Sequence, residues 1–395
     1  MKKTNLIPKN SWMIVLLATI GLSLPLVFQN CGEGFSVRGF DTVTMAYGGV
    51  FRKDCLERED VDSCLYFKNP VSQKGQPVAA DEMAGLQLLA VQLKDLDGSG
   101  YLKNDSFEVY SAQHGRAQAG DQSWRFRYGT TGAEGLPQVM AYYWAQTSLA
   151  EIENRLNGPS ALAGKNLSII TEAGYTGFSV AESKIFLAQG SRQVDNAAWS
   201  ADVLIHLLME AHIYYSSAGA AYDLTGDTNH QDCGPQDGPV FQLECCTSQN
   251  GCSRALTAGL ADFWVARMFP DAPTLGESLS QNVNGLTHCG QSRHLEYMAG
   301  MTAAAAYGAC DSVGYPGQVY TMGSLMASIW FEIWKEARAA DSAWEVEALF
   351  LESQKYITGQ DDFVSFLGKI RQADGRMFNG KWSARFEAEF AKRGL

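Results

Sequence analysis

Three polar side chains interrupt the stretch Asp202–Tyr215, which otherwise has the apolar composition of a buried helix. They are His206, Glu210 and His212. Residues four apart lie one turn apart on one helix face, so His206 and Glu210 are neighbours, whereas His212 projects about 160° away from Glu210. An isolated buried carboxylate is costly, so it must be paired, protonated or bound to a cation. The spacing therefore predicts either two satisfied core residues or a site for a divalent metal.

Two later stretches, in order along the chain, give this helix a family resemblance. They are "TAGLADFWVARMFPDAPTLGES" (257–278) and "GQVYTMGSLMASIWFEIWK" (317–335). Together the three stretches resemble the motifs His-Glu-x-x-His, Glu-Gly-x-Ala-Asp and Val-His-x-x-Gly of gluzincin metallopeptidases, in particular the fungalysin and thermolysin-like members. The resemblance covers roughly residues 136–395 and implies a gluzincin-like fold. The small and apolar framework positions that match are Asp202, Val203, Gly259, Ala261, Asp262, Val319, Gly323 and Trp330.

Carried over position by position, the same resemblance implies that the hydrolytic groups are missing. His206 stands at the first zinc ligand, but Glu210 replaces the second His and Ala258 replaces the Glu that supplies the third ligand. Leu207 stands where the general base belongs, and Tyr320 where the family has its transition-state His. Catalytic zinc needs three protein ligands and a base for its water. We therefore expect no catalytic residue and no resident metal at these vestigial positions.

One supporting carboxylate of the family motif is retained. Asp262 matches the Asp that accepts a hydrogen bond from the first His ligand. We expect His206 within hydrogen-bond reach of Asp262, and no cation between His206 and Glu210. A protonated His206 would bridge the two carboxylates, so that an ion-pair network takes over the structural contribution of the metal.

The first 30 residues have the layout of an export signal. Three lysines precede the apolar run Trp12–Val27, and Cys31 follows it. This is similar to a bacterial lipoprotein signal, in which the Cys becomes the lipidated N-terminus, although residues 28–30 depart from the usual pattern. An ordinary secretory signal is the alternative. We expect a lipid-anchored protein of the cell envelope, held on the periplasmic or surface face of the outer membrane.

Cysteine usage also favours an oxidising compartment. There are nine cysteines, and lipidation of Cys31 leaves eight, an even number. No CxxC pair occurs, which disfavours a zinc cluster. Local grouping predicts the disulfides Cys55–Cys64 and Cys289–Cys310. Two further bonds, of open connectivity, are expected among Cys233, Cys245, Cys246 and Cys252.

An acidic loop offers a second candidate cation site. Asp95, Asp97, Ser99 and Tyr101 fall at positions one, three, five and seven of an EF-hand loop, but the twelfth residue is Ser106, not the bidentate Glu. Asp and Gly also supply the chemistry of a tight turn. We expect a hairpin turn here, with weak calcium binding as the alternative.

The order of elements predicts an α+β protein. After a signal at 1–30, residues 31–132 read as a β-rich region, and residues 133–395 as a gluzincin-like domain. That domain is expected to hold a small sheet, the helix described above and a helical C-terminal half. Hydrophobic residues make up 46% of the chain, which indicates a globular protein, and the formal net charge of −12 without a basic cluster excludes nucleic-acid partners.

The function expected from these observations is binding or scaffolding by an inactive, metallopeptidase-like pseudoenzyme in the envelope. Its partners would be the membrane, through the lipid anchor, and a protein or peptide ligand that the sequence does not identify. Two alternatives stay open. One is an active zinc endopeptidase with rearranged ligands. The other is a disulfide-stapled surface adhesin whose likeness to the peptidases is accidental.

Overall fold

A computed structural model describes most of the chain after residue 49. All described residues belong to the second of two compact units, residues 40–395. Among the described helices, none combines the length and the apolar composition that a membrane span requires. The described ranges are 50–52, 55–57, 61–119, 124–129, 132–190, 196–218, 251–270, 274–276, 293–308, 317–359 and 361–395.

A small antiparallel sheet begins the unit. Its strand order is β1-β3-β2, with β3 in the centre. A disulfide joins Cys55 to the buried Cys64 of β2, as predicted. The other predicted disulfides involve side chains outside the described residues. The elements of this region are β1 (Val50–Arg52), η1 (Cys55–Glu57), β2 (Ser63–Leu65), α2 (Pro70–Lys74), η2 (Ala80–Gly85) and β3 (Leu88–Val91).

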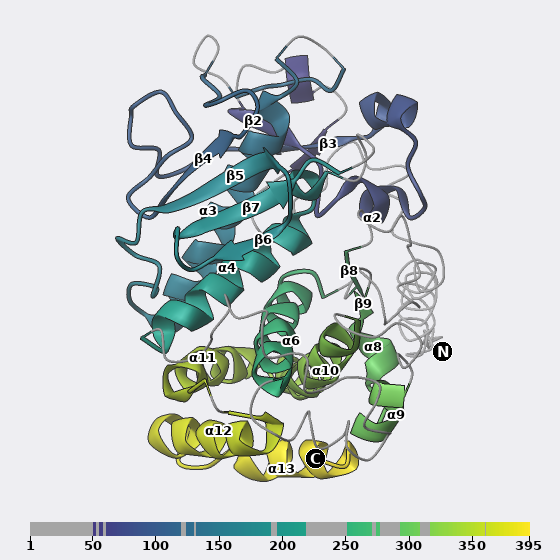
Figure 1. The fold of residues 1–395 in the computed structure, drawn as a ribbon, viewed down its shortest axis with the longest axis vertical. Helices are drawn as coiled ribbons and strands as arrows, with labels where there is room; N and C mark the ends of the chain where they lie inside the picture. Colours follow the sequence, from purple (N-terminus) through teal and green to yellow (C-terminus); the bar gives the residue numbers. More distant parts are fainter. Residues whose placement is uncertain are drawn as a thin grey trace, which may run out of the picture. The chain divides into compact units, whose positions relative to one another are not determined.

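A four-stranded sheet follows, in the order β4-β5-β7-β6 (Figure 1). β4, β5 and β7 are parallel, and β6 is an antiparallel edge strand. Alternate residues such as Val109, Ile169 and Ile185 are buried, because α3 and α4 pack against this sheet. The elements are β4 (Phe107–Ser111), α3 (Gly135–Leu156), β5 (Leu167–Ala173), β6 (Gly177–Ser179), β7 (Lys184–Ala188), η4 (Ala197–Trp199) and α4 (Ala201–Ser216).

The prediction of a hairpin around Asp97 is wrong, although the turn itself is present. Gly98 and Gly100 have φ of 78° and 82°, and Asp97 Oδ1 accepts the backbone N–H of Ser99 at 2.9 Å. The strands before and after this turn, β3 and β4, lie in different sheets. β3 already has β1 on one side and β2 on the other, so no edge is left for β4. Because β4 pairs with β5, one sheet draws strands from both sides of the domain boundary expected after residue 132.

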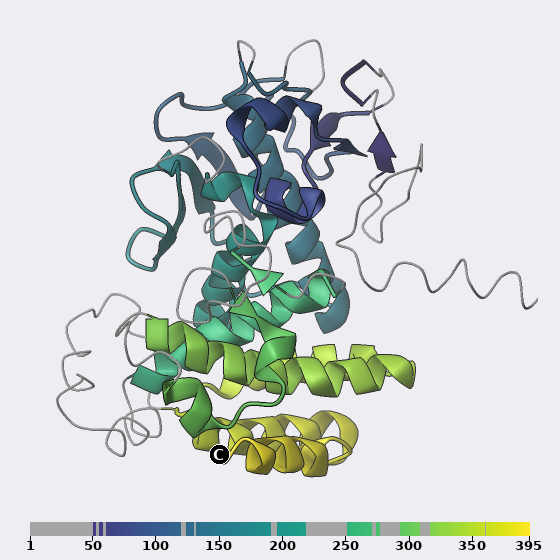
Figure 2. The same cartoon turned by 90° about the vertical axis from the view of Figure 1, so that its right-hand side faces the viewer.

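The remainder is helical, as expected, and the fold class is α+β. α6 and α10 form the central pair, and α4 packs on α6. Figures 1 and 2 show α10 to α13 gathered together. The elements are α6 (Gly251–Met268), β8 (Thr274–Leu275), β9 (Arg293–His294), α8 (Leu295–Met298), α9 (Ala303–Gly308), α10 (Gly317–Ala339), α11 (Ala343–Ser353), η6 (Gln354–Tyr356), α12 (Phe363–Phe378) and α13 (Ser383–Lys392).

The contact between α6 and α10 is made at glycines. A Cβ added to Gly323 would lie 2.8 Å from the carbonyl oxygen of Ala255 and 3.0 Å from the nitrogen of Gly259. A Cβ added to Gly259 would meet the carbonyl oxygen of Gly323 and lie 3.0 Å from Cβ of Met326. The two backbones therefore touch, and this close approach fixes the position of α6.

Candidate functional site

His206 and Asp262 meet between α4 and α6. The His206 side chain is 8% exposed and the Asp262 side chain is fully buried. His206 Nδ1 lies 2.7 Å from Asp262 Oδ1, so the contact expected from the sequence is present. These residues are 56 positions apart in the chain, and their pairing joins the two helices through one charged hydrogen bond.

The second ring nitrogen of His206 faces Glu210 on the next turn of α4. The distance from Nε2 to Glu210 Oε1 is 3.3 Å, and the Glu210 side chain is 14% exposed. Burial lowers the pKa of His206, but the charges and hydrogen bonds of Glu210 and Asp262 outweigh it and raise this pKa to about 9. At neutral pH the ring is therefore protonated, and each ring N–H faces a carboxylate. This is the ion-pair bridge expected above.

The positions that the resemblance assigns to a general base and a third metal ligand hold apolar side chains. Leu207 is 6% exposed and Ala258 is 1% exposed, so both belong to the core. Tyr320 lies in α10, and its side chain is outside the described part. His206 and Glu210 are two donors, and among the described residues no three His, Cys, Asp or Glu side chains gather where they could share an ion. This donor set does not fit a catalytic zinc, which needs three protein ligands.

A buried carboxylate at the start of α4 holds the helix in place. Asp202 is fully buried, and its Oδ2 accepts the backbone N–H of Gly276 at 2.8 Å. Its Oδ1 accepts from Asn69 Nδ2 at 3.4 Å. A negative charge in the first turn is also favourable toward the helix dipole. Asp202 thus connects α4 to Gly276, which follows β8, and to Asn69, the N-cap residue of α2.

His212 belongs to a different part of the core. Its Nδ1 lies 3.0 Å from Gln354 Oε1, and since that oxygen only accepts, Nδ1 carries the proton. Burial lowers the pKa of His212 to about 4, so this ring is neutral at pH 7. It takes no part in the His206 site, in keeping with its place on another helix face.

The acidic loop lies at a separate cavity. Asp95 Oδ2 accepts from Gln146 Nε2 at 3.1 Å, and Lys103 lies 3.8 Å from Asp97. Calcium binding by Asp95, Asp97, Ser99 and Tyr101 stays a prediction. The cavity has a volume of about 420 Å³ and does not reach His206. Its polar lining residues are Asp95, Asp97, Asn104, Asp105, Ser106, Gln146 and Glu153.

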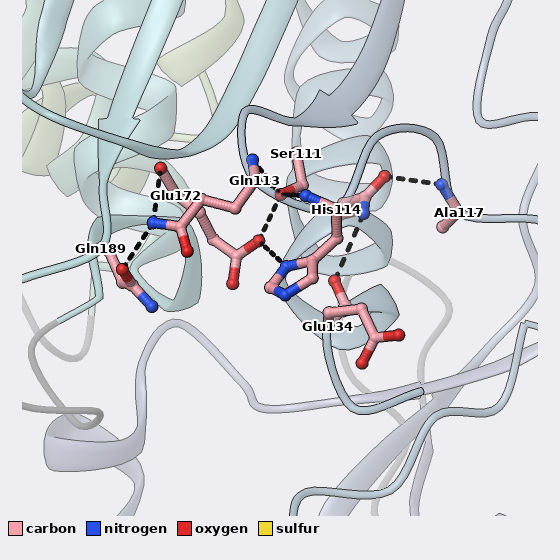
Figure 3. A network of polar contacts seen from close by, with 8 residues as sticks. Ser111, Gln113, His114, Ala117, Glu134, Glu172 and Gln189 are labelled. Atoms are coloured by element: carbon pink, nitrogen blue, oxygen red, sulfur yellow. Dashed lines mark hydrogen bonds and ion pairs between the residues drawn. The ribbon is translucent and has the colours of Figure 1, made fainter. Parts of the chain in front are cut away.

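A polar cluster that the sequence did not reveal lies where the parallel strands end (Figure 3). Ser111 Oγ donates to Glu172, and His114 Nδ1 lies 2.8 Å from Glu172 Oε2. Gln113 Nε2 donates to Gln189 Oε1 at 2.7 Å. Glu172 has a φ of 55° beside a register shift in β5, a conformation that side-chain-bearing residues rarely adopt. The five residues come from the ends of β4, β5 and β7.

The hydrogen-bond order in this cluster is not that of a catalytic triad. In a triad the histidine contacts the serine hydroxyl, whereas here Ser111 and His114 both contact Glu172. Ser111 Oγ instead accepts the backbone N–H groups of Gln113 at 3.0 Å and His114 at 2.9 Å. The hydrogen bond to Glu172 raises the pKa of His114, whose side chain is 47% exposed. The cluster closes the turn after β4.

The raised pKa of His206 predicts a pH-dependent stability. A group whose pKa is higher in the folded state stabilises the fold fully below its unfolded value of 6.5. That contribution is lost as the pH rises through about 9. We expect the free energy of unfolding to fall by about 2 kcal/mol between pH 7 and pH 9. Urea unfolding across this range measures it, with His206→Gln as the control that flattens the curve. Parallel curves for the two proteins contradict the assignment.

No protein-family model and no curated protein matches the chain. Among the solved structures it matches is the precursor of protealysin, a metalloproteinase from Serratia proteamaculans. The match covers 77% of this chain and 91% of that chain, at 13% identity and a TM-score of 0.47. A similarity this low is no evidence for a shared activity.

Proposed function

We propose that this chain is an exported, lipid-anchored envelope protein whose gluzincin-like domain binds a protein or peptide without hydrolysing it. The observation that carries the proposal is the pair of buried apolar residues Leu207 and Ala258. They stand where the resemblance requires a general base and a third metal ligand. Leu207 cannot accept the proton of an attacking water and Ala258 cannot hold a metal ion, so the described residues around His206 supply neither the base nor the third ligand.

The gluzincin likeness itself is supported by this chain's own residues. The three motif-like stretches begin on α4, α6 and α10, and α6 packs against both α4 and α10. His206 pairs with Asp262 across α4 and α6, the arrangement in which a zinc-binding histidine is oriented by a carboxylate. Gly259 and Gly323, two of the matched framework positions, make the close approach of α6 and α10.

The ion-pair bridge gives a physical reason why such a fold persists without metal. A structural metal ion joins the helices or strands that carry its ligands, and loss of the ion leaves these helices or strands unconnected. Here protonated His206 is positioned between Glu210 on its own helix and Asp262 on the neighbouring helix. A buried charged group is stable only when it is paired in this way. We infer that the fold outlasted the hydrolytic groups through this bridge, and that its remaining role is binding.

The direct test is metal content and proteolysis of the mature protein purified from membranes. We expect substoichiometric zinc by elemental analysis and no chelator-sensitive cleavage of casein. Addition of zinc is expected to leave both results unchanged. Stoichiometric zinc together with chelator-sensitive cleavage overturns the proposal and establishes the rearranged peptidase instead.

A restoration experiment tests the gluzincin likeness separately. The double variant Glu210→His, Ala258→Glu supplies the two missing ligands beside His206. We expect it to bind one zinc and to gain thermal stability on zinc addition, because ligands at these three positions converge in the family. The matched control, Glu210→His with Ala258→Leu, adds similar bulk without a donor. Ala258→Asp replaces the Glu if the longer side chain disrupts folding. A folded variant that binds no more zinc than the control contradicts the likeness.

A further inference from the structure

Exposed apolar side chains concentrate on the C-terminal helices. Of the four large apolar side chains that are exposed among the described residues, three lie on α11 and α12. Trp344 is 55% exposed and packs edge-on against Phe378, with ring centroids 5.9 Å apart. Met377, which precedes Phe378, is 40% exposed. We call this surface the tryptophan patch; it comprises Trp344, Met377, Phe378, Lys381 and Trp382.

The ion pairs at the patch have their cations outward. Lys381 Nζ lies 2.5 Å from Glu345 Oε2, but the lysine side chain is 49% exposed and the glutamate only 16%. The ion pair of Arg376 and Glu352 has the same asymmetry. The arginine side chain is 65% exposed and the glutamate side chain is 16% exposed. Trp382 Nε1 also donates to Glu345, so this carboxylate is enclosed beneath the surface. The patch therefore presents the ammonium group of Lys381, and Arg376 directly precedes its Met377 in the sequence, on a chain whose net charge is −12.

We propose that the tryptophan patch rests on the anionic surface of the membrane to which the chain is anchored. Tryptophan favours the boundary between lipid and water, where its ring is partly apolar and its N–H stays polar. Lysine and arginine lay their stems along apolar surface and keep their charged ends at the headgroups. Basic residues near anionic lipid are also attracted electrostatically. This proposal depends on the lipid anchor and is independent of the His206 site.

The size of the patch favours a lipid surface over a protein partner. A stable protein interface buries roughly 800 Å² on each side and involves about 20 to 30 residues. The patch offers two exposed apolar side chains, with Phe378 and Trp382 half-buried beside them. Such a contact is weak on its own. It becomes sufficient when a covalent lipid already holds the chain near the bilayer, because the second contact is then intramolecular.

Lysine footprinting of the full lipid-modified chain tests the proposal. The protein is reconstituted in vesicles of phosphatidylcholine alone or mixed with phosphatidylglycerol, and flotation verifies the anchor. An amine-acetylating reagent then reports on Lys381, with Lys103 as a matched internal control, since their side chains are 49% and 50% exposed. We expect about five-fold less acetylation of Lys381 in the anionic vesicles, reversed by high salt, and no change at Lys103.

Variants of the exposed apolar residues make the test specific. Trp344→Ser with Met377→Ser is expected to abolish the protection of Lys381. Val364→Ser is the control, because Val364 is 50% exposed on the same helix α12, roughly 20 Å along it from Met377. Equal acetylation of Lys381 in both kinds of vesicle overturns the proposal. Protection of Lys381 that increases with protein concentration and does not depend on lipid charge also overturns the proposal. That result would identify the patch as a contact between copies of this chain. A failure of flotation instead refutes the anchor.

Discussion

Replacing Asp262 by alanine lowers the free energy of unfolding by about 4 kcal/mol, an expectation that follows from a buried charge losing its partner. His206 is 8% exposed and protonated at neutral pH, and Asp262 is its closest carboxylate. Without Asp262, the ring keeps only the longer contact to Glu210, and the pKa of His206 falls. The variant must then leave one nitrogen of a buried ring without a hydrogen-bond partner.

A double-mutant cycle separates this pairing from the loss of bulk. Asp262→Asn keeps the shape and removes the charge, so its loss should be smaller than that of the alanine variant. His206→Leu removes the positively charged ring with which Asp262 pairs. We expect the double variant His206→Leu, Asp262→Ala to lose at least about 2 kcal/mol less unfolding free energy than the sum of the losses of the two single variants. Urea unfolding measures each variant. Additive losses would falsify the pairing as a source of stability.

Much of this site could be predicted from the sequence because its geometry is local. His206 and Glu210 are one turn apart in any helix, so their contact needs only the helix to form. Because α4 is otherwise apolar, His206 and Glu210 had to satisfy each other or a third group. Asp262 lies 56 positions away, and only the family resemblance connected it with His206. The long amphipathic helices of the C-terminal half were predictable for the same local reason.

The features that escaped prediction depend on contacts between distant segments. Glu172 meets Ser111 and His114 only because β5 pairs in parallel with β4, a register that no local pattern specifies. Its positive φ arises from the irregular end of β5 and has no signal in the residue type. The absent hairpin has a similar origin, since β3 is enclosed by β1 and β2. The tryptophan patch is apolar by sequence, and apolar helix residues are ordinarily assigned to the core.

The glycine contact between α6 and α10 gives a second large expected effect. On an isolated helix, replacing Gly259 by alanine is stabilising by up to about 1 kcal/mol. In this chain the new methyl group meets the carbonyl oxygen of Gly323 and lies 3.0 Å from Cβ of Met326. Backbone atoms have no alternative rotamer, so α6 and α10 must separate. The net loss of unfolding free energy is expected to be about 3 kcal/mol.

The consequence extends to the His206 site, because α6 carries Asp262. Movement of α6 by a fraction of an ångström lengthens the hydrogen bond to His206 and lowers the pKa of that ring. We therefore expect Gly259→Ala to weaken the pH dependence of stability as well as the stability itself. Gly375→Ala is the matched control, since Gly375 also lies within a helix but no atom lies within 4 Å of an added Cβ. Thermal melts at pH 7 and pH 9 measure both effects. If Gly259→Ala behaves like Gly375→Ala, the helices are not in backbone contact at this crossing.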